Sequence, residues 1–452
     1  MEKEKVTMDK IESLAKRRGF IYRGSEIYGG LAGTWDYGPL GVALKKNIKD
    51  IWWKRFVEDR SDMYGVDAAI LMSSKVWEAA GHVATFADPM VECPNCHHRF
   101  RADTIEYGKD GFQHCPDCYK HELLGAPRMF NMMFKTTVGA MEDSSSTVYL
   151  RPETAQGMFV NFKNIVDSFH PRLPFGMGQI GKAFRNEITP RDFVFRTREF
   201  EQMEIEYFVK PTDWQEHFEL WRKEMHDWMK DIGLRNNDVY ELEVEPEDLA
   251  HYSKRTIDFE FDFPFGKKEL YGLAYRTDFD LRSHQKESTV NLEYIDDVNK
   301  EKFLAHVIEP TFGLDRTILA ILCTAYDEEE VEGPASAEGS GVAKETRSVL
   351  RLPKHLAPVK IAILPLSKKE ELSAVARPIF DALKKDFVVQ YDETQSIGKR
   401  YRRQDEIGTP YCVTVDFETL NDKAVTVRDR DTMKQERIAI EKLPEYLKEK
   451  FK

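Results

Sequence analysis

The segment 193–209, FVFRTREFEQMEIEYFV, constrains the fold of this chain more than any other. Aromatic and charged residues alternate along it, and such alternation is typical of a β-strand whose side chains point to two faces in turn. A shorter strand-like run ends at Phe184-Arg185-Asn186-Glu187, and a turn with Pro190 and Asp192 separates the two runs. We therefore expect two strands joined by this turn.

The order of side chains on the longer strand suggests a ligand. One face would carry Val194, Arg196, Arg198, Phe200, Gln202, Glu204, Glu206 and Phe208, and the other Phe193, Phe195, Thr197, Glu199, Glu201, Met203, Ile205 and Tyr207. Two arginines, an aromatic ring and two acids in this order suit a molecule with phosphates at one end and a cationic amine at the other. A solvated face held by ion pairs is the ordinary explanation, and the pattern alone leaves both open.

Four of the six cysteines form two pairs, Cys93-x2-Cys96 and Cys115-x2-Cys118. This spacing is typical of a tetrathiolate zinc site, in which four sulfurs close the coordination shell and the metal is structural. Another metal, or none, remains an alternative, and His97, His98 and His114 lie close enough to replace a ligand. Cys323 and Cys412 stand alone in apolar surroundings and are interpreted as core thiols.

Composition along the 452 residues divides the chain into domains. Trp214, Phe218, Trp221, Met225 and Trp228 recur at helical spacing and predict one core-facing helix face. Residues 257–280 are expected to form strands, and 312–326 a buried helix. An acidic run at 327–330 followed by a Gly/Ser-rich stretch at 333–341 predicts a flexible connection, after which strand-like and helix-like segments alternate as in a small α/β domain. We expect a domain at 1–345, with the cysteine pairs in an insertion at 88–128, and a second domain at 346–452.

Charge gives a weaker indication of partners. The formal net charge is −12, from 66 Lys and Arg against 78 Asp and Glu, which does not favour nucleic acid. A basic run at 399–403, KRYRR, could nevertheless contact an RNA backbone, with Tyr401 available for stacking, or could be a solvated helix face. No apolar run approaches the ~18 residues of a membrane span, and the first residues lack the pattern of a secretory signal. We expect a cytoplasmic protein.

Several motifs together resemble one family. FRNE, a turn and FRTREFEQME look like motif 2 of class II aminoacyl-tRNA synthetases, GGLAGTWDYGPLG (29–41) resembles the motif 1 region of glycyl-tRNA synthetases, and EPTFGLDR (309–316) resembles motif 3. YLRPETAQGMFVNFKN (149–164) and YGLAYRTDFDL (271–281) resemble the same family, and residues from about 357 onward resemble its anticodon-binding domain. The resemblance covers essentially the whole chain, in order.

The resemblance implies a fold and an activity. The fold would be α/β (α+β): an antiparallel-sheet catalytic domain of class II with a zinc-ribbon-like insertion, then an α/β anticodon-binding domain. The activity would be that of a ligase which joins glycine to ATP, giving glycyl-adenylate, and passes glycine to the 3′ end of tRNA(Gly). ATP, Mg²⁺ and a structural Zn²⁺ would be required, and the enzyme would be a homodimer through motif 1. A synthetase for another small amino acid, and a non-catalytic nucleic-acid-binding relative, are the alternatives.

Site residues follow from the matched motifs. Arg185, Glu187 and Arg316 would be central to catalysis, at the α-phosphate, the adenine amino group and the γ-phosphate, while Phe200 would stack on adenine and Glu269 could hold Mg²⁺. The positions that match ATP contacts are Arg185, Asn186, Glu187, Phe195, Arg196, Thr197, Arg198, Glu199, Phe200, Glu269, Leu270, Gly313, Leu314, Asp315 and Arg316. Those that match the glycine side are Arg101, Glu153, Phe200, Glu201, Gln202, Met203, Glu204, Glu309, Pro310, Thr311, Phe312 and Gly313. Thr311 replaces a usual serine, which predicts a slightly tighter pocket.

Overall fold

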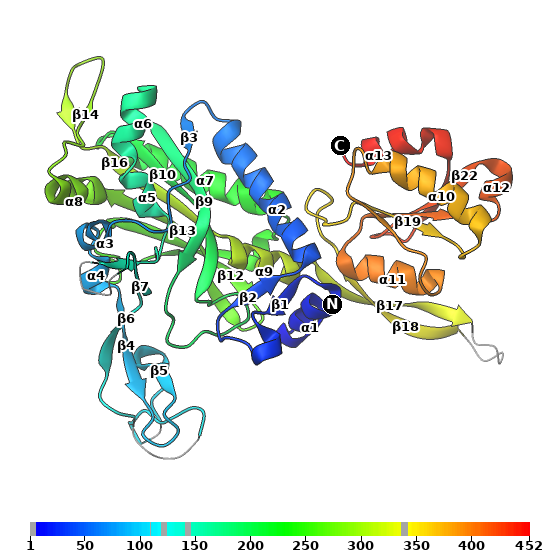
Figure 1. The fold of residues 1–452 in the computed structure, drawn as a ribbon, viewed down its shortest axis with the longest axis horizontal. Coiled ribbons are helices and arrows are strands. Elements are labelled where there is room, and N and C mark those ends of the chain that lie inside the picture. Colours follow the sequence, from blue (N-terminus) through cyan, green and yellow to red (C-terminus); the bar gives the residue numbers. More distant parts are fainter. Residues whose placement is uncertain (1–5, 109, 119–123, 141–145, 336–341) are drawn as a thin grey trace.

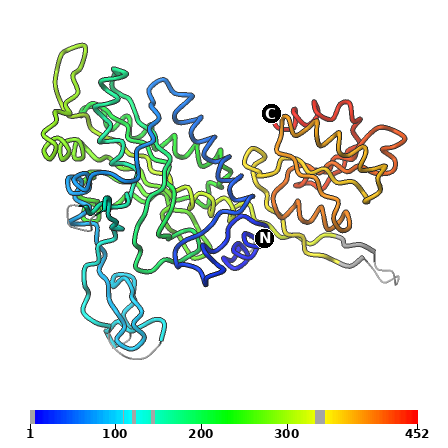
Figure 2. Tube along the Cα trace, in the orientation of Figure 1, coloured from blue at the N-terminus to red at the C-terminus, as the bar shows by residue number. Residues whose placement is uncertain are grey.

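The computed structural model describes residues 6–108, 110–118, 124–140, 146–335 and 342–452. A large lobe holds most of the chain, and a smaller lobe beside it holds the C-terminal residues (Figures 1 and 2). Within the described ranges, no helix combines the length and apolar content that crossing a lipid bilayer demands.

A seven-stranded sheet organises the large lobe. Its spatial order is β11 (Val239–Glu243), β12 (Arg255–Phe263), β13 (Gly266–Thr277), β16 (His306–Gly313), β10 (Glu199–Val209), β9 (Phe175–Phe184) and β3 (Met63–Gly65). All neighbours pair antiparallel except β3 and β9, which are parallel. The predicted strands at 257–280 are confirmed, although residues from Phe279 begin a helix, α8 (Phe279–Ser288).

Helices cover one face of this sheet. They are α2 (Pro39–Trp53), α7 (Trp214–Asp231) and α9 (Leu314–Ala325). The predicted inner face of α7 is confirmed, because Phe218, Trp221, Met225 and Trp228 are fully buried and Trp214 is half-buried against the same core. Trp52 of α2 meets Phe312 of β16 edge-on at 6.0 Å between ring centroids. Burying each such side chain stabilises the fold by about 1.5–3 kcal/mol, so this layer fixes α2 and α9 on the sheet.

The opposite face of the sheet is covered only in part. Helices α5 (Ala155–Phe159) and α6 (Phe162–Phe169) pack Phe159 and Phe162 against Phe208. Phe208 lies near the end of β10, and Thr154, which precedes α5, donates to Gln202 and Glu204 on the same face of that strand. The cavity described below opens at the start of β10, around Phe200.

The cysteine pairs lie in a projecting element (Figure 1, lower left). It is built on a three-stranded sheet of β4 (Ala87–Glu92), β5 (Arg99–Arg101) and β6 (Arg128–Asn131). The remaining short elements of the large lobe are α1 (Met8–Arg18), β1 (Ile21–Arg23), β2 (Trp35–Tyr37), α3 (Ser74–Ala79), α4 (His82–Thr85), β7 (Lys135–Thr137), β8 (Thr147–Tyr149), β14 (Tyr294–Ile295) and β15 (Lys302–Phe303).

The small lobe is a mixed α/β domain, as predicted. Its sheet has the order β20 (Val389–Tyr391), β19 (Ile361–Pro365), β21 (Tyr411–Val415), β22 (Ala424–Asp429) and β23 (Gln435–Ala439), with β19 parallel to β20 and β21. Helices α10 (Glu370–Leu383), α11 (Ile397–Ile407), α12 (Thr419–Asp422) and α13 (Leu443–Lys450) accompany it.

The predicted flexible connection is wrong for the residues that the structure describes. β17 (Tyr326–Ala335) and β18 (Val342–Leu350) pair antiparallel as a hairpin from Tyr326↔Leu350 to Ala335↔Val342, and residues 336–341 lie outside the described ranges. A domain boundary at 345 falls inside β18.

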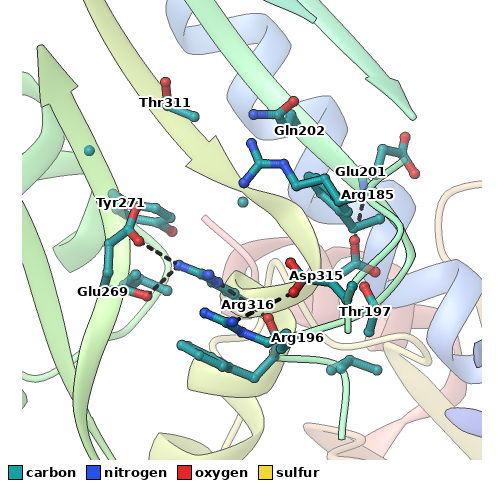
Figure 3. Close-up of a pocket in the computed structure, with 17 residues that line it drawn as sticks. Arg185, Arg196, Thr197, Glu201, Gln202, Glu269, Tyr271, Thr311, Asp315 and Arg316 are labelled. Atoms are coloured by element: carbon teal, nitrogen blue, oxygen red, sulfur yellow. Dashed lines mark hydrogen bonds and ion pairs between the residues drawn. The ribbon is translucent and has the colours of Figure 1, made fainter. Parts of the chain in front are cut away.

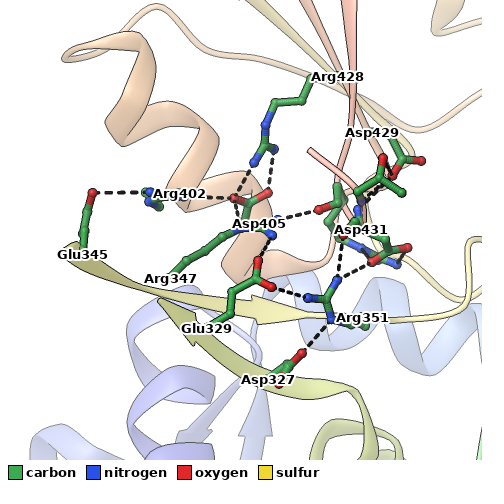
Figure 4. A network of polar contacts seen from close by, with 12 residues as sticks. Asp327, Glu329, Glu345, Arg347, Arg351, Arg402, Asp405, Arg428, Asp429 and Asp431 are labelled. Atoms are coloured by element: carbon green, nitrogen blue, oxygen red, sulfur yellow. Dashed lines mark hydrogen bonds and ion pairs between the residues drawn. The ribbon is translucent and has the colours of Figure 1, made fainter. Parts of the chain in front are cut away.

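Ion pairs explain why the acidic run is ordered (Figure 4). Arg347 of β18 is fully buried and donates to Asp405 of α11 at 2.8 Å and to Glu329. Arg351 donates to Asp327 at 2.8 Å and to Glu329 at 3.0 Å. Arginines distant in sequence thus neutralise the acids, and they fasten the hairpin to the small lobe.

Candidate active site

The nucleotide pocket, as we call the cavity at the start of β10, is lined by residues from most of the predicted site segments, but not by Arg101 or Glu153 (Figure 3). It brings together Arg185, Glu187, Phe195, Arg196, Thr197, Phe200, Glu201, Gln202, Glu269, Leu270, Thr311, Gly313, Asp315 and Arg316. β9 ends just before Arg185, β10 supplies Phe200 and Gln202, and Arg316 lies in the first turn of α9. The sheet register therefore gathers segments that are over 100 residues apart in sequence.

Three arginines give this pocket its charge. Arg185 lies beside the ring of Phe200, 5.2 Å from its centroid, and Nε donates to the carbonyl of Pro152 at 3.1 Å. Arg316 lies over the ring of Phe195 at 4.3 Å and donates to the backbone oxygen of Glu269 at 2.8 Å. Rings and backbone carbonyls help to hold the guanidinium planes of Arg185 and Arg316, and arginines held in this way suit a polyphosphate.

Four acidic residues also line the nucleotide pocket, and two of them, Glu187 and Glu269, pair with its arginines. Arg316 pairs with the exposed carboxylate of Glu269 at 3.1 Å, and this ion pair lowers the pKa of Glu269. Glu187 is buried, and its Oε2 forms an ion pair with Arg196 at 3.5 Å but no hydrogen bond within the described part of the chain. This oxygen could therefore still accept a hydrogen bond from an exocyclic amine on a ligand.

A second cavity of about 300 Å³ adjoins the first and shares Arg185, Gln202, Glu269, Gly272 and Thr311 with it. We call it the acid pocket, because its distinctive lining residues are Glu153, Glu204 and Glu309. All three are buried, and Thr311 Oγ1 donates to Glu204 at 3.0 Å. Such a group of buried carboxyls suits a small cationic group.

Neighbouring side chains set the ionisation of these acids. Burial raises the pKa of Glu309 to about 8, with Glu204 and Glu153 adding to the rise. Burial and Glu153 likewise raise the pKa of Glu204. Although burial opposes it, the pKa of Glu153 is lowered, because His82 and Arg276 lie close to its carboxylate. Arg276 is 1% exposed.

Two residues beneath the acid pocket received no role from the motifs. Arg276 of β13 donates to Glu309 at 2.6 Å and forms a two-pronged ion pair with Asp280. Glu206 is fully buried, neither carboxyl oxygen has a partner among the described residues, and burial beside Glu309 raises its pKa well above the ordinary value. Alternation along β10 already placed Glu206 on the face of Glu204, whereas nothing in the sequence marked Arg276 as the counter-ion.

The predicted strand at 193–209 is too long by its first six residues. β10 begins at Glu199, and residues 191–196 form a turn in which Asp192 and Phe193 have φ of 58°. Phe193 is buried and packs edge-on against Trp35 with ring centroids 4.6 Å apart. This contact holds the turn, so the predicted alternation of faces applies only from residue 199 onward.

Some expected site residues make other contacts. The Glu201 carboxylate pairs with Lys45 and Lys49 of α2, on the helix-covered face of β10, and Asp315 accepts from the Glu201 backbone N–H at 2.7 Å. Arg101 pairs with Asp88 at 2.8 Å and with Asp103 at 2.6 Å.

The remaining expected residues lie around the two pockets or beneath them. Arg198 donates to the backbone oxygens of Glu187 and Ala32, and the exposed Glu199 pairs with Lys182. The Asn186 backbone N–H donates to Met132 O. Met203, Phe312 and Leu314 belong to the core, and Pro310 is buried in β16.

The four paired cysteines meet in the projecting element. Their Sγ atoms all lie within 4.8 Å of one another, with Cys93 and Cys118 at 3.8 Å and Cys96 and Cys115 at 3.5 Å. Four sulfurs bound to one Zn²⁺ at ~2.3 Å would be separated by about 3.8 Å in a tetrahedron, so the group fits that ion. Cys323 and Cys412 are buried, as predicted.

The basic run lies on α11, and the structure corrects its interpretation. Arg400 is buried and donates to backbone oxygens of Pro365, Leu366 and Asp392. Tyr401 hydroxyl and Thr414 share a hydrogen bond at 2.6 Å, so this ring is not free to stack on a base. Lys399, Arg402 and Arg403 remain along a surface groove.

Comparisons with known proteins agree with this architecture. Residues 134–324 match the class II tRNA synthetase core domain (G, H, P, S and T), and residues 360–450 match the anticodon-binding domain. The chain is similar to prolyl-tRNA synthetase from Cryptosporidium parvum in complex with halofuginone and AMPPNP, with a TM-score of 0.66 over 98% of this chain and 77% of that one at 15% identity, which shows a shared fold.

Closer similarity comes from two curated bacterial proteins, both glycine–tRNA ligases. The protein from Caldanaerobacter subterraneus is 52% identical over 99% of both chains, and the protein from Clostridium acetobutylicum is 51% identical over 100% of both. Identity of this extent covers both lobes as well as the projecting element. The chain therefore belongs to the glycine–tRNA ligase family of class II aminoacyl-tRNA synthetases.

Proposed function

We propose that this chain activates glycine with ATP and transfers it to tRNA(Gly), forming a carbon–oxygen ester bond. The observation that carries the proposal is the junction of the two pockets, at which cationic and acidic linings share Arg185 and Gln202. An amino acid whose ammonium enters the acid pocket would present its carboxylate to a phosphate held by Arg185. This order of groups is the one that amino-acid activation requires.

Activation then needs no protein nucleophile. The glycine carboxylate oxygen attacks the α-phosphorus, the bond to the bridging oxygen breaks, and pyrophosphate leaves. Arg185 stabilises the charge on the α-phosphate, Arg196 and Arg316 hold the outer phosphates, Phe200 stacks on adenine and Glu187 accepts from its amino group. Glu269 offers the oxygen donor that Mg²⁺ prefers, and that ion would neutralise the outer phosphates. The ribose 3′-OH of tRNA next attacks the glycyl carbonyl carbon, and AMP leaves.

Selection of glycine rests on space as well as charge. Glu153, Glu204 and Glu309 surround the ammonium position, and Thr311 contributes a methyl group that a serine would lack. Because glycine is the smallest amino acid, a close-fitting pocket excludes all others by steric clash, and no editing site is needed.

Other parts of the molecule support further proposals. The small lobe would bind the anticodon of tRNA, and the four cysteines would hold a structural Zn²⁺. The catalytic domain would span residues 1–345, with a zinc-binding insertion at 88–128, and the anticodon-binding domain would span residues 346–452.

Ile27 and Tyr28, just before the glycine-rich segment 29–41, and Leu31 within it are 89%, 87% and 60% exposed, which favours a homodimer through this region. We place the enzyme in the cytoplasm.

Pyrophosphate exchange tests the central proposal. Exchange of labelled pyrophosphate into ATP should depend on glycine and should be at least a hundredfold weaker with alanine, serine or threonine. If exchange were stronger with another amino acid, that amino acid would be the substrate in place of glycine. Absence of exchange with every amino acid, from protein that binds ATP, would instead favour a non-catalytic relative.

A further inference from the structure

A cluster of charged side chains adjoins the nucleotide pocket on the helix-covered face of β10, and two of its residues, Glu201 and Asp315, also line that pocket. Lys45 Nζ lies 2.9 Å from Glu201 and 3.7 Å from Asp315, and Lys49 Nζ lies 2.9 Å from Glu201. The Tyr37 hydroxyl donates to Asp315. We call these five residues the rear cluster.

The rear cluster is partly buried and balanced in charge, and Lys49 is its most exposed ion-pair partner at 34%. The side chains of Lys45, Glu201 and Asp315 are 13%, 11% and 9% exposed. Although burial alone would lower it, Asp315 and Glu201 raise the pKa of Lys45, so the ammonium stays charged. Burial and Asp315 raise the pKa of Tyr37 well above its ordinary value, so its hydroxyl remains a donor. Two cations therefore face two carboxylates in a partly dry environment, where ion pairs are stronger than at the surface.

The same cluster connects two sides of the nucleotide pocket. Glu201 follows Phe200 on β10, and Asp315 precedes Arg316 in the first turn of α9 (Figure 3). Asp315 accepts from the Glu201 backbone N–H at 2.7 Å, which ties the two segments directly. Any change in the position of Asp315 must therefore move Arg316 relative to Phe200.

We propose that Lys45 is a positioning residue for ATP, which fixes Arg316 relative to Phe200 by bridging the carboxylates of Asp315 and Glu201. On this account Glu201 and Asp315, which also line the nucleotide pocket, act on ATP through their neighbours Phe200 and Arg316. Without the Lys45 ammonium, the two carboxylates would repel each other across the joint between β10 and α9. The glycine side would be spared, because Glu204 and Glu309 lie on the opposite face of the sheet. This inference depends on the proposed function only for the KM measurements, which require glycine-dependent exchange.

The test compares Lys45→Met with Lys46→Met. Lys46 is the matched control, because it follows on the same helix, is 70% exposed and pairs only with Asp50 among the described residues. For Lys45→Met we expect the KM for ATP in glycine-dependent exchange to rise about tenfold, with the KM for glycine within twofold of wild type, since one buried pair is lost. Lys46→Met should match wild type, and Lys45→Arg should restore most of the ATP affinity.

Direct measurement of ATP binding separates this inference from the proposed function. Calorimetric titration of each variant with ATP and Mg²⁺ should show the same tenfold loss for Lys45→Met, whether or not glycine is the substrate. Equal rises in both KM values, or unchanged ATP binding, would overturn the positioning role. If Lys45→Met does not fold, Tyr37→Phe removes only one hydroxyl and should still raise the Kd for ATP about two- to threefold; no rise would count against the proposal.

Discussion

The two connected pockets are suited to ligand groups of opposite charge, and they use different kinds of ionisable side chain. At the nucleotide pocket the cations are arginines, and Arg196 and Arg316 are each 24% exposed. At the acid pocket the charges are carboxyls on buried residues, with Arg276 at 1% exposure as the counter-ion beneath them. Arginine remains charged at every accessible pH, whereas buried carboxyls change their protonation with their surroundings. The nucleotide end should therefore be insensitive to pH, and the amine end should respond to it.

The largest expected effect is at Arg185, where the pockets meet. Arg185→Ala should reduce the rate of pyrophosphate exchange by about 10²–10³-fold, because it removes a preorganised cation from the reacting phosphate. Circular dichroism and the melting temperature should remain those of wild type, since the Arg185 side chain donates to the backbone oxygen of Pro152 and otherwise contacts aromatic rings. If the variant exchanged pyrophosphate at nearly the wild-type rate, the role proposed for Arg185 would be wrong.

A selective effect is expected at Glu309. Glu309→Gln should raise the KM for glycine about 30-fold or more, since losing one partner of a buried charge pair costs about 2–5 kcal/mol. The KM for ATP should change less than threefold, because Glu309 does not line the nucleotide pocket.

Glu219→Gln on α7 provides the control for Glu309→Gln. Glu219 is also paired with arginine but is 50% exposed, so its loss should leave both KM values unaltered. Equal losses for ATP and glycine in Glu309→Gln would contradict the division of the site into two pockets.

Regular patterns in the sequence predicted most of the fold. Helix α7, the buried helix α9 and the C-terminal α/β domain follow from apolar spacing, which reflects local geometry that every helix or strand must obey. The turn at 191–196 could not be predicted in this way, because it depends on Phe193 packing against a distant Trp35. The β17–β18 hairpin was also not predicted, because it depends on a contact between residues that are distant in sequence: Arg347 pairs with Glu329 of the acidic run, 18 residues away.

For the candidate site, the sequence predicted which residues of β10 share a face but not which side chains pair with one another. Alternation along β10 predicted that Phe200, Gln202, Glu204 and Glu206 share a face, and from residue 199 this holds. Alternation could not show that Tyr401 bonds to Thr414, or that Arg276 is the counter-ion of Glu309, because these pairs form only through tertiary packing.

A smaller, graded effect is expected from pH. Burial raises the pKa of Glu309 to about 8, so the empty pocket holds a proton below that pH, and an incoming ammonium must displace it. The KM for glycine should therefore rise as pH falls below about 8, by at most tenfold per unit, while the KM for ATP stays level. The charged or titratable groups that face Glu309 are Glu153, Glu204, Glu206, Asp280, Tyr252 and Arg276.

Kinetics from pH 6.5 to 9 and calorimetry check this proton linkage. Titration with glycine below pH 8 in two buffers of different ionisation enthalpy should show release of up to one proton per site. A glycine KM that is flat across the range, or no proton release, would contradict it. Glu309→Gln should abolish the pH dependence, because no ionisable group remains at that position.

The smallest catalytic effect is expected at Glu206, directly behind Glu309. Both carboxyl oxygens lack partners among the described residues, and an isolated buried carboxylate is costly, so the group should be neutral. Glu206→Gln replaces one neutral group with another of similar shape, and KM and kcat should stay within about threefold of wild type.

The stability of the Glu206→Gln variant tests the protonation of Glu206 more directly than its kinetics. Because the native state keeps a proton that the unfolded chain loses above about pH 4.3, wild-type stability declines with rising pH by up to about 1.4 kcal/mol per unit. Glu206→Gln removes this decline, so its melting temperature should exceed that of wild type at pH 8 and approach it at pH 5. A variant that melts lower than wild type at both pH values would mean that Glu206 is ionised and that its charge belongs to the acid pocket.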